Sequence, residues 1–288
     1  MATERALLLQ LIEKIQNNTL VLPTLPEVAM RVRQQCQDPD CPLDQLANTI
    51  MQDPALTTRL VALANSAAFG GRVKVDSLAL AVKRLGLSKT RELASAVAMH
   101  QLFYSEQERT WRWMESLWQQ SVEVASCALA VLACLHDQGL QRHLNSDTLL
   151  LACLVHNIGA LPLLDQWERC PALLPDEQHL SRAIQLLGPQ LGKTVLENWD
   201  FPEALVEVAR HGRDSAYQTP EVSYLDLVRL AAVYSRLWPT SEPLTSQLEL
   251  FQRKGVLPSL DLFGMDTYFL TYNSVRASLA PQPEEAVA

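Results

Sequence analysis

The run Asp147–Leu164, DTLLLACLVHNIGALPLL, constrains the fold more than any other part of the chain. Residues 149–155 are apolar without a polar break, and His156, Asn157 and Gly159 follow almost directly. A helix that is apolar on every side has to lie at the centre of a domain. We therefore expect the His–Asn pair at its end inside the fold, either in a hydrogen-bonded core network or in a site.

Hydrophobic periodicity predicts helices in the rest of the chain. Apolar residues recur every three or four positions in segments 4–17 and 110–136. Asp53-Pro54 is typical of a helix start, because Asp accepts a hydrogen bond at the cap and Pro fits the first turn. No segment alternates apolar and polar residues over several strands. We predict an all-α, multi-helix bundle, with further helices at 27–35, 42–51, 55–67, 78–85, 88–103, 177–187, 190–199, 201–211 and 222–237, and one or two more before about residue 279.

The composition argues against several classes of protein. A net charge of −8 and a pI near 5.3 disfavour general nucleic-acid binding, which requires a dominant basic surface. No run reaches the roughly 18 uninterrupted apolar residues of a membrane span. Glu4 and Glu13 interrupt the apolar N-terminal run, which indicates an amphipathic helix and not a signal peptide. The six cysteines form no CxxC motif, so we expect reduced thiols and a cytoplasmic protein without membrane or nucleic-acid partners.

Two parts of the chain carry a family resemblance. The first contains a proline-flanked entry, then Gln-Asp-Pro-Ala-Leu, Leu-Ala-Asn-Ser and Arg-Leu-Gly in this order. The second contains VHNIGALPLL and, further on, GPQLGKTVLENWDFPEALVEVARHG. Together they resemble the HDOD domain, the HD-related output domain of bacterial signalling proteins and an all-α relative of the HD phosphohydrolases. The segments concerned are 22–71, 77–93, 155–164 and 188–212, within a resemblance that covers roughly residues 20–235.

The resemblance implies a domain organisation. We expect an HDOD-like domain at residues 20–237, preceded by an N-terminal helix at 1–19 and followed by a C-terminal helical extension and tail at 238–288. With no sensor or enzyme domain before it, the chain is expected to be a free-standing member of the family.

The resemblance also indicates where a metal site would lie. HD hydrolases hold one or two divalent cations with a His, an adjacent His-Asp pair and a distant Asp, and the cation activates a bound water. In this chain the His-Asp pair reads His156-Asn157, and an amide lacks the carboxylate's charge. With one or two imidazoles and no carboxylate, we predict no metal, no cofactor and no catalytic residue. The remnant pocket implied by the resemblance comprises Gln120, His156, Asn157, Gly188, His211 and Ala232.

Two interpretations of His156 remain open. It could be a core histidine hydrogen-bonded to Asn157 or Gln120, or it could face a ligand pocket. The resemblance implies a non-catalytic signal transduction or regulatory module that contacts partner signalling proteins, with a small ligand such as a nucleotide as a further option. The alternative is a metal-dependent phosphohydrolase with a divalent cation in a rearranged site formed by His156, His211 and a carboxylate such as Asp165 or Asp226.

Two further features have a plain and a functional interpretation. Four cations bracket Gly86 and could contact a phosphate near a helix N-terminus, or could form a solvated face. Trp111 and Trp118 are seven residues apart and are expected in the core, whereas Trp113 points elsewhere and could mark a groove. The four cations are Lys83, Arg84, Lys89 and Arg91.

Overall fold

The computed structural model describes residues 9, 12–14, 17, 19–71, 73–238 and 242–280. Over these ranges the chain forms helices and turns and no strand, so the predicted all-α class is confirmed. The expected helix at 4–17 lies mostly outside the described residues. The helices are α2 (Glu27–Gln35), α3 (Leu43–Ile50), α4 (Pro54–Ala64), α5 (Leu78–Ala98), η1 (Met99–Leu102), α6 (Glu108–Asp137), α7 (Ser146–Val155), η2 (Ile158–Ala160), α8 (Leu161–Arg169), α9 (Glu177–Asn198), α10 (Glu203–His211), α11 (Tyr224–Tyr234), α12 (Leu244–Lys254), η3 (Leu260–Gly264) and α13 (Asp266–Leu279).

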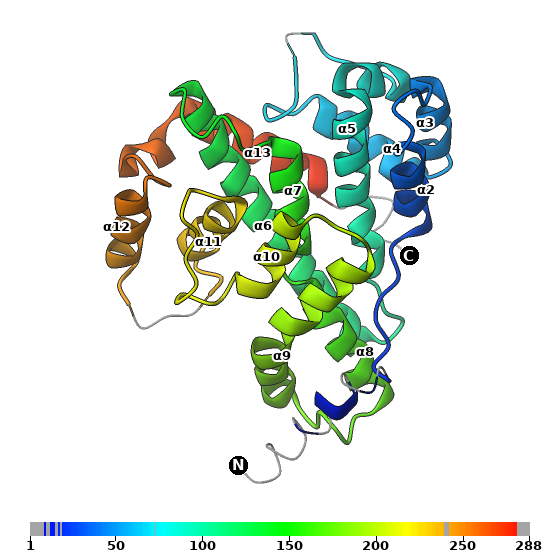
Figure 1. Ribbon diagram of the computed structural model, residues 1–288, viewed down its shortest axis with the longest axis vertical. Helices are drawn as coiled ribbons and strands as arrows, with labels where there is room; N and C mark the ends of the chain where they lie inside the picture. Colours follow the sequence, from blue (N-terminus) through cyan, green and yellow to red (C-terminus); the bar gives the residue numbers. More distant parts are fainter. Residues whose placement is uncertain are drawn as a thin grey trace.

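The helices α2, α3 and α4 pack against α5 and form one end of the molecule (Figure 1). Asp53 caps α4 as predicted, because its carboxylate accepts a hydrogen bond from the Leu56 N–H at 2.9 Å. Gly86 interrupts α5 with φ 76° and ψ 175°, a conformation that a residue with a side chain rarely adopts. The predicted stop at Gly86 is therefore a kink between two helical segments that follow one another without a loop.

The centre of the fold is formed by α6 and α7, which pack against each other (Figure 1). Every residue of the apolar run 149–155 in α7 is fully buried, as the sequence predicts. Two segments, Glu108–Asp137 and Ser146–Arg169, are long and apolar enough to cross a membrane. Their apolar windows are 78% and 94% buried inside the fold, and core helices meet the same criterion, so they are weak evidence for a membrane span.

The helix α9 differs from the prediction of two helices with a break at Gly188-Pro189. It runs without interruption from Glu177 to Asn198, with Pro189 inside. Proline removes one hydrogen bond and crowds the preceding turn. Buried apolar residues on both sides of it, including Ile184 and Leu191, hold the helix in one piece because their packing outweighs that local cost.

The C-terminal helix α13 lies along α6 and also contacts α4. Polar contacts converge on Glu123 of α6, whose carboxylate accepts hydrogen bonds from Tyr272 at 2.7 and 2.8 Å and from Arg276 at 2.9 Å. The helix α12 packs mainly on α11 and lies at the outer edge of the molecule (Figure 1).

Candidate functional site

The central helix α7 ends at Val155, and the chain then turns sharply through His156 and Asn157 into η2. The turn packs directly on the backbone of α9. A Cβ atom at Gly159 would lie 1.9 Å from the carbonyl oxygen of Gly188 and 2.5 Å from the nitrogen of Gly192. Only glycine permits this approach, which brings the His–Asn pair against the middle of α9.

A small cavity lies at this junction, with a volume of about 20 Å³. A space of this size holds roughly one water molecule. Its walls are mostly apolar or backbone, and its polar side chains are those of His156, Asn157 and Arg213. The lining residues are His156, Asn157, Gly159, Ala160, Ile184, Gly188, Pro189, Ala209, Gly212, Arg213 and Trp238.

The electrostatic state of His156 follows from its surroundings. The side chain is buried, and its Nδ1 lies 2.6 Å from the carbonyl oxygen of Cys153. Burial, and to a smaller extent the positive charge of Arg213, lower the pKa of His156 to about 4, against the opposing effect of the Cys153 hydrogen bond. The ring is therefore neutral at pH 7. Because Nδ1 must donate to the carbonyl, Nε2 carries a lone pair and can only accept.

Two buried polar atoms at the cavity have no hydrogen-bond partner within the described part of the chain. They are Nε2 of His156 and the side-chain nitrogen of Asn157, in residues that are 7% and 8% exposed. One accepts and the other donates. An unpaired buried polar group costs about 1–3 kcal/mol, so the pair is suited to a small polar group that donates to one atom and accepts from the other.

The residues around the cavity do not fit a divalent cation. None of the lining residues is Asp or Glu, and Arg213 adds a positive charge. Among the described residues, no group of three or more His, Cys, Asp and Glu side chains is placed to hold a metal ion. One imidazole and one amide are a poor donor set for the hard cations that HD enzymes use.

The predicted pocket residues are not all at the cavity. Gly188 lines it, and a Cβ atom there would meet only the side chain of Ile184, at 3.8 Å. Gln120 lies on α6 and donates to Ser116 at 3.3 Å, and Ala232 is fully buried in α11; neither lines the cavity. The expected partners of His156 in a core network were Asn157 and Gln120, but the observed partner is a backbone carbonyl, which sequence spacing could not identify.

The other residues of the rearranged metal site do not line the cavity. His211 stacks on Tyr217, with ring centres 3.8 Å apart and an interplanar angle of 13°. Asp165 pairs with Arg169 on the same helix at 2.8 Å. Asp226 belongs to a separate network described below, and none of these three candidate ligands lines the cavity.

Three of the four cations that bracket the α5 kink have separate partners, and the fourth, Lys89, is exposed. Lys83 lies 3.8 Å from Asp44, Arg84 donates to two backbone carbonyl oxygens in and after α4, and Arg91 pairs with Glu92 at 2.8 Å. The contacts point in different directions, which favours the interpretation as a solvated face.

The tryptophans of α6 differ in burial. Trp118 is fully buried, as predicted, but Trp111 is 41% exposed, so its prediction as a core residue is wrong. Trp111 lies in the first turn of α6. Trp113 is half-buried and lines two adjoining surface depressions between the first turns of α6 and α9, where a groove was expected.

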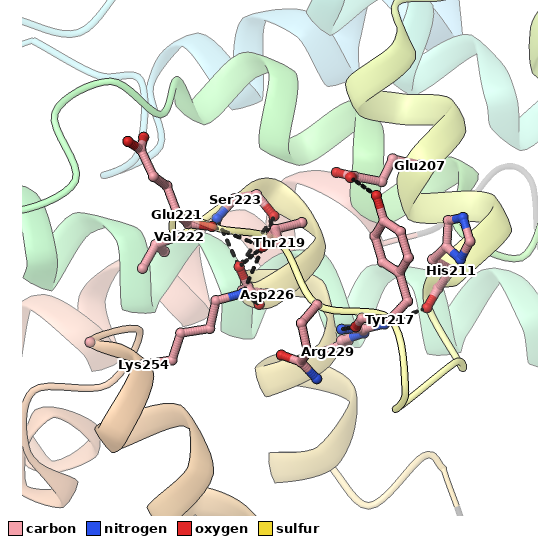
Figure 2. A network of polar contacts seen from close by, with 12 residues as sticks. Glu207, His211, Tyr217, Thr219, Glu221, Val222, Ser223, Asp226, Arg229 and Lys254 are labelled. Atoms are coloured by element: carbon pink, nitrogen blue, oxygen red, sulfur yellow. Dashed lines mark hydrogen bonds and ion pairs between the residues drawn. The ribbon is translucent and has the colours of Figure 1, made fainter.

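Sequence reasoning missed a polar network beside the cavity (Figure 2). Arg229 of α11 is buried and donates to the backbone carbonyl oxygens of His211 at 2.7 Å, Gly212 at 3.2 Å, Tyr217 at 2.8 Å and also Asp214. One guanidinium thus fixes the loop that carries Arg213 to the cavity. Backbone acceptors leave no trace in a sequence, so this role could not be predicted.

Asp226 is the second centre of the network (Figure 2). Its carboxylate accepts from the backbone and side chain of Ser223, from Thr219 at 2.9 Å and from Lys254 at 2.7 Å. The Ser-x-x-Asp spacing of 223–226 is a capping-box signal that could have been found in the sequence. The contribution of Lys254, from α12, could not.

Solved structures place this fold among known proteins. A Shewanella amazonensis SB2B protein, provisionally named a metal-dependent phosphohydrolase, is 38% identical, with a TM-score of 0.93 over 97% of this chain and 100% of that one. An HDOD domain protein from Geobacter sulfurreducens shares the fold at 22% identity, with a TM-score of 0.61 over 94% and 96% of the two chains. A provisionally named signal transduction protein from Marinobacter aquaeolei VT8 does so at 22% identity and a TM-score of 0.58, over 96% of this chain and 65% of that one.

Sequence comparison agrees with the fold. An uncharacterized protein of Treponema pallidum (strain Nichols) is 25% identical over 198 residues, which are 66% of this chain and 37% of that protein. The chain thus spans little more than a third of that relative's length. The HDOD domain family matches residues 22–215, which contain α2 to α10 and the whole cavity turn. Since the match covers well over half of the chain, this protein belongs to the HDOD domain family.

Proposed function

We propose that this chain is a non-catalytic HDOD signal transduction or regulatory module, which contacts partner signalling proteins and binds a small polar ligand in the cavity beside His156. The observation that carries the proposal is the chemistry of that cavity. It offers a neutral imidazole acceptor and an amide donor, both buried, and no carboxylate. Such a pair favours reversible hydrogen bonding over cation-assisted hydrolysis.

The surroundings of the cavity support the absence of catalysis. Hydrolysis of a phosphodiester by an HD-type mechanism needs anionic ligands that hold a cation against the substrate. At positions 157, 188 and 232 the chain has Asn157, Gly188 and Ala232. These residues retain the shape of the fold but supply no charge. The provisional name of the Marinobacter structure, a signal transduction protein, agrees with a regulatory function.

Metal content and turnover test the proposal together. The purified full chain is incubated with Mn²⁺ and Mg²⁺, dialysed and analysed for bound metal, and then assayed on bis-p-nitrophenyl phosphate. We expect no stoichiometric metal and no hydrolysis above that of the metal ions alone. The matched variant His156→Ala should behave identically. Turnover in the native chain that disappears in His156→Ala would overturn the proposal.

A metal-dependent phosphohydrolase is the second candidate, because the 38% identical Shewanella protein carries that provisional name. The site would need carboxylates that approach His156 after a rearrangement. Asp165 and Asp226 are the candidates raised by the sequence, and they are paired with Arg169 and Lys254, respectively. The same assay separates the two functions: Asp165→Asn and Asp226→Asn would both abolish activity in a phosphohydrolase and would change nothing in a binding module that lacks it.

A further inference from the structure

We propose that the groove between the first turns of α6 and α9 is a docking surface for an acidic, amphipathic helix of a partner protein. The inference deepens the partner-binding part of the proposed function and rests on it. It combines three observations: the helical walls of the groove, the aromatic platform at its base and the distribution of charge along its lining.

The groove consists of two adjoining depressions with volumes of about 460 and 580 Å³, which share Trp113 and Glu177. Both walls are helical, because α6 and α9 each pack on α8 and leave a further face open to solvent. The wall from α9 lies within residues 177–186. The wall from α6 includes Arg109, Arg112, Trp113 and Ser116, whose spacing places them on one helical face. Two helical ridges with a channel between them form a surface on which a third helix can pack.

An aromatic platform forms the base of the groove. The half-buried ring of Trp113 lies edge to face against the buried Trp167 of α8, with ring centres 6.5 Å apart and an interplanar angle of 83°. The guanidinium of Arg109 lies 3.8 Å from the centre of the same Trp167 ring. Trp and Arg side chains that are held in place are the residues that contribute most at protein interfaces. The exposed Leu186 adds apolar surface on the opposite wall, so a large apolar side chain of the partner can pack against it and Trp113.

The charges in the groove are unevenly distributed. Its two carboxylates belong to Glu108 and Glu177, the first residues of α6 and α9, where the positive ends of the helix dipoles offset them. The rest of the lining contains three guanidinium groups and no carboxylate. These groups belong to Arg109, Arg112 and Arg182. The body of the groove is therefore positive and complements a helix that carries carboxylates.

Two of these arginines are suited to bind carboxylates of a partner. Within the described part of the chain, Arg109 forms no ion pair and contacts only the face of Trp167. Arg112 pairs with Glu108, but the two side chains are 70% and 75% exposed. Such an exposed pair contributes little stability, so Arg112 can exchange Glu108 for a carboxylate of the partner.

The charge of the whole chain makes this attraction local. A net charge of −8 repels an acidic segment from most of the surface. An acidic helix gains electrostatic attraction at the groove, where the guanidinium groups are. A basic helix would be attracted to the rest of the surface and repelled at the groove. The contrast selects an acidic partner for this position.

A designed peptide tests the inference on the full chain. The probe is a fluorescein-labelled helix that repeats Glu-Leu-Ala-Ala-Glu-Leu-Ala, which places a stripe of Leu beside a stripe of Glu. We expect its fluorescence anisotropy to rise on titration with the protein and its affinity to fall as salt is added. A second peptide with Gln in place of every Glu keeps the apolar stripe, and it should bind about tenfold more weakly.

Two arginines provide a matched pair of variants. Arg112 and Arg253 each pair with a Glu four residues earlier, and their side chains are 70% and 71% exposed. Arg112 lies in the groove, whereas Arg253 lies on α12. Arg112→Glu should lower the affinity for the Glu peptide about tenfold, because a repulsion replaces an attraction. Arg253→Glu changes the net charge by the same amount and should leave the affinity unchanged.

The indole N–H resonance of Trp113 in the NMR spectrum locates the bound peptide. Its loss in Trp113→Phe identifies it. Saturation with the Glu peptide should shift this resonance and leave that of the fully buried Trp118 in place. A Trp113 resonance that did not move at saturation would place the peptide elsewhere and overturn the inference.

The affinities can overturn it as well. No binding of the Glu peptide, or equal binding of the Gln peptide, would refute the acidic partner. Equal losses in Arg112→Glu and Arg253→Glu would show that the groove is not the site of attraction. Displacement of the probe by a synthetic peptide of residues 1–16 would assign the groove to this chain's own N-terminal segment. A native dimer that Arg112→Glu dissociates would assign it to a second copy.

These measurements involve no metal and no turnover. Their failure would remove the docking surface and leave the non-catalytic function standing, because the metal and phosphodiester assays decide that function separately.

Discussion

The turn after α7 and the loop after α10 lie next to each other, but they differ in whether their buried polar atoms are hydrogen-bonded. Around Arg229 and Asp226 the side chains carry multiple hydrogen bonds that join the loop, α11 and α12. Around His156 and Asn157 two buried atoms have no partner within the residues described. Folding alone explains a satisfied network, whereas buried unpaired atoms cost stability. The first region thus holds the loop in place, and the second is the region in which we propose a ligand site.

A substitution at the close backbone contact between η2 and α9 should lower stability more than any other change proposed here. Gly159→Ala places a methyl group 1.9 Å from a backbone oxygen of α9, so the two elements must separate. We expect the free energy of unfolding to fall by at least about 4 kcal/mol, or no folded protein to form. Gly264→Ala is the control, because a Cβ atom there has no neighbour within 4 Å. If urea denaturation gave similar midpoints for both variants, the close packing of η2 on α9 would be refuted.

Loss of the Arg229 hydrogen-bond network should have the second-largest effect on stability. Arg229→Met removes the donor shared by several loop carbonyls, and we expect a loss of about 3 kcal/mol in the free energy of unfolding. The exposed ion pair of Arg253 with Glu249, at 3.9 Å, provides the control Arg253→Met, with a loss below about 0.5 kcal/mol. Equal stability of the two variants in urea would contradict the view of Arg229 as the fastening of the loop.

The buried neutral histidine should make stability depend on pH. The pKa of His156 is lowered from 6.5 to about 4 by burial, so the unfolded chain takes up a proton first as the pH falls. Stability is thus complete above pH 6.5 and is lost as the pH falls from 6.5 toward 4. Between about pH 7 and about pH 5, the native chain should lose about 2 kcal/mol more than His156→Gln.

The comparison isolates His156 because the other buried histidine is present in both proteins. Burial also lowers the pKa of His100 to about 4, so His100 contributes equally to the native chain and to His156→Gln. Denaturant midpoints at each pH provide the measurement. A native chain that lost no more stability than His156→Gln would mean that His156 is not buried in its neutral form.

The capping box should show the smallest effect. Ser223→Ala removes the side-chain hydroxyl that donates to Asp226 at 3.2 Å but leaves the backbone N–H of residue 223, Thr219 and Lys254 bound to Asp226. We expect a loss of about 1 kcal/mol in thermal or urea unfolding. Thr245→Ala, at an exposed position in α12, should cost less. A loss as large as that of Arg229→Met would mean that Asp226 depends on Ser223 and not on its other donors.

The sequence was sufficient for the parts of the fold that follow from local patterns. The unbroken apolar run of α7 and the Asp53-Pro54 cap were predicted because neighbouring residues determine them, and the predicted helix end at Gly86 is a kink within α5. The His156–Asn157 turn was identified for the same reason. Pro189 was misjudged because tertiary packing on both sides outweighs one lost hydrogen bond.

The residues that complete the wall of the cavity could not be predicted from the sequence. Arg213 reaches the cavity from the loop after α10 and Trp238 from the segment after α11, and Lys254 reaches Asp226 from α12. These contacts depend on how distant helices pack, and no spacing rule encodes them. Trp111 illustrates the same limit: a spacing of seven residues from the buried Trp118 predicted a core position, but Trp111 is exposed.

Diffraction from crystals of the full chain grown with Mn²⁺ tests the central claim most directly, because manganese scatters anomalously and identifies itself. The account predicts no anomalous peak within coordination distance of His156, and a water or ligand atom between Nε2 of His156 and the side-chain nitrogen of Asn157. A manganese ion bound to Nε2 would contradict it and would make the phosphohydrolase the better account of this protein.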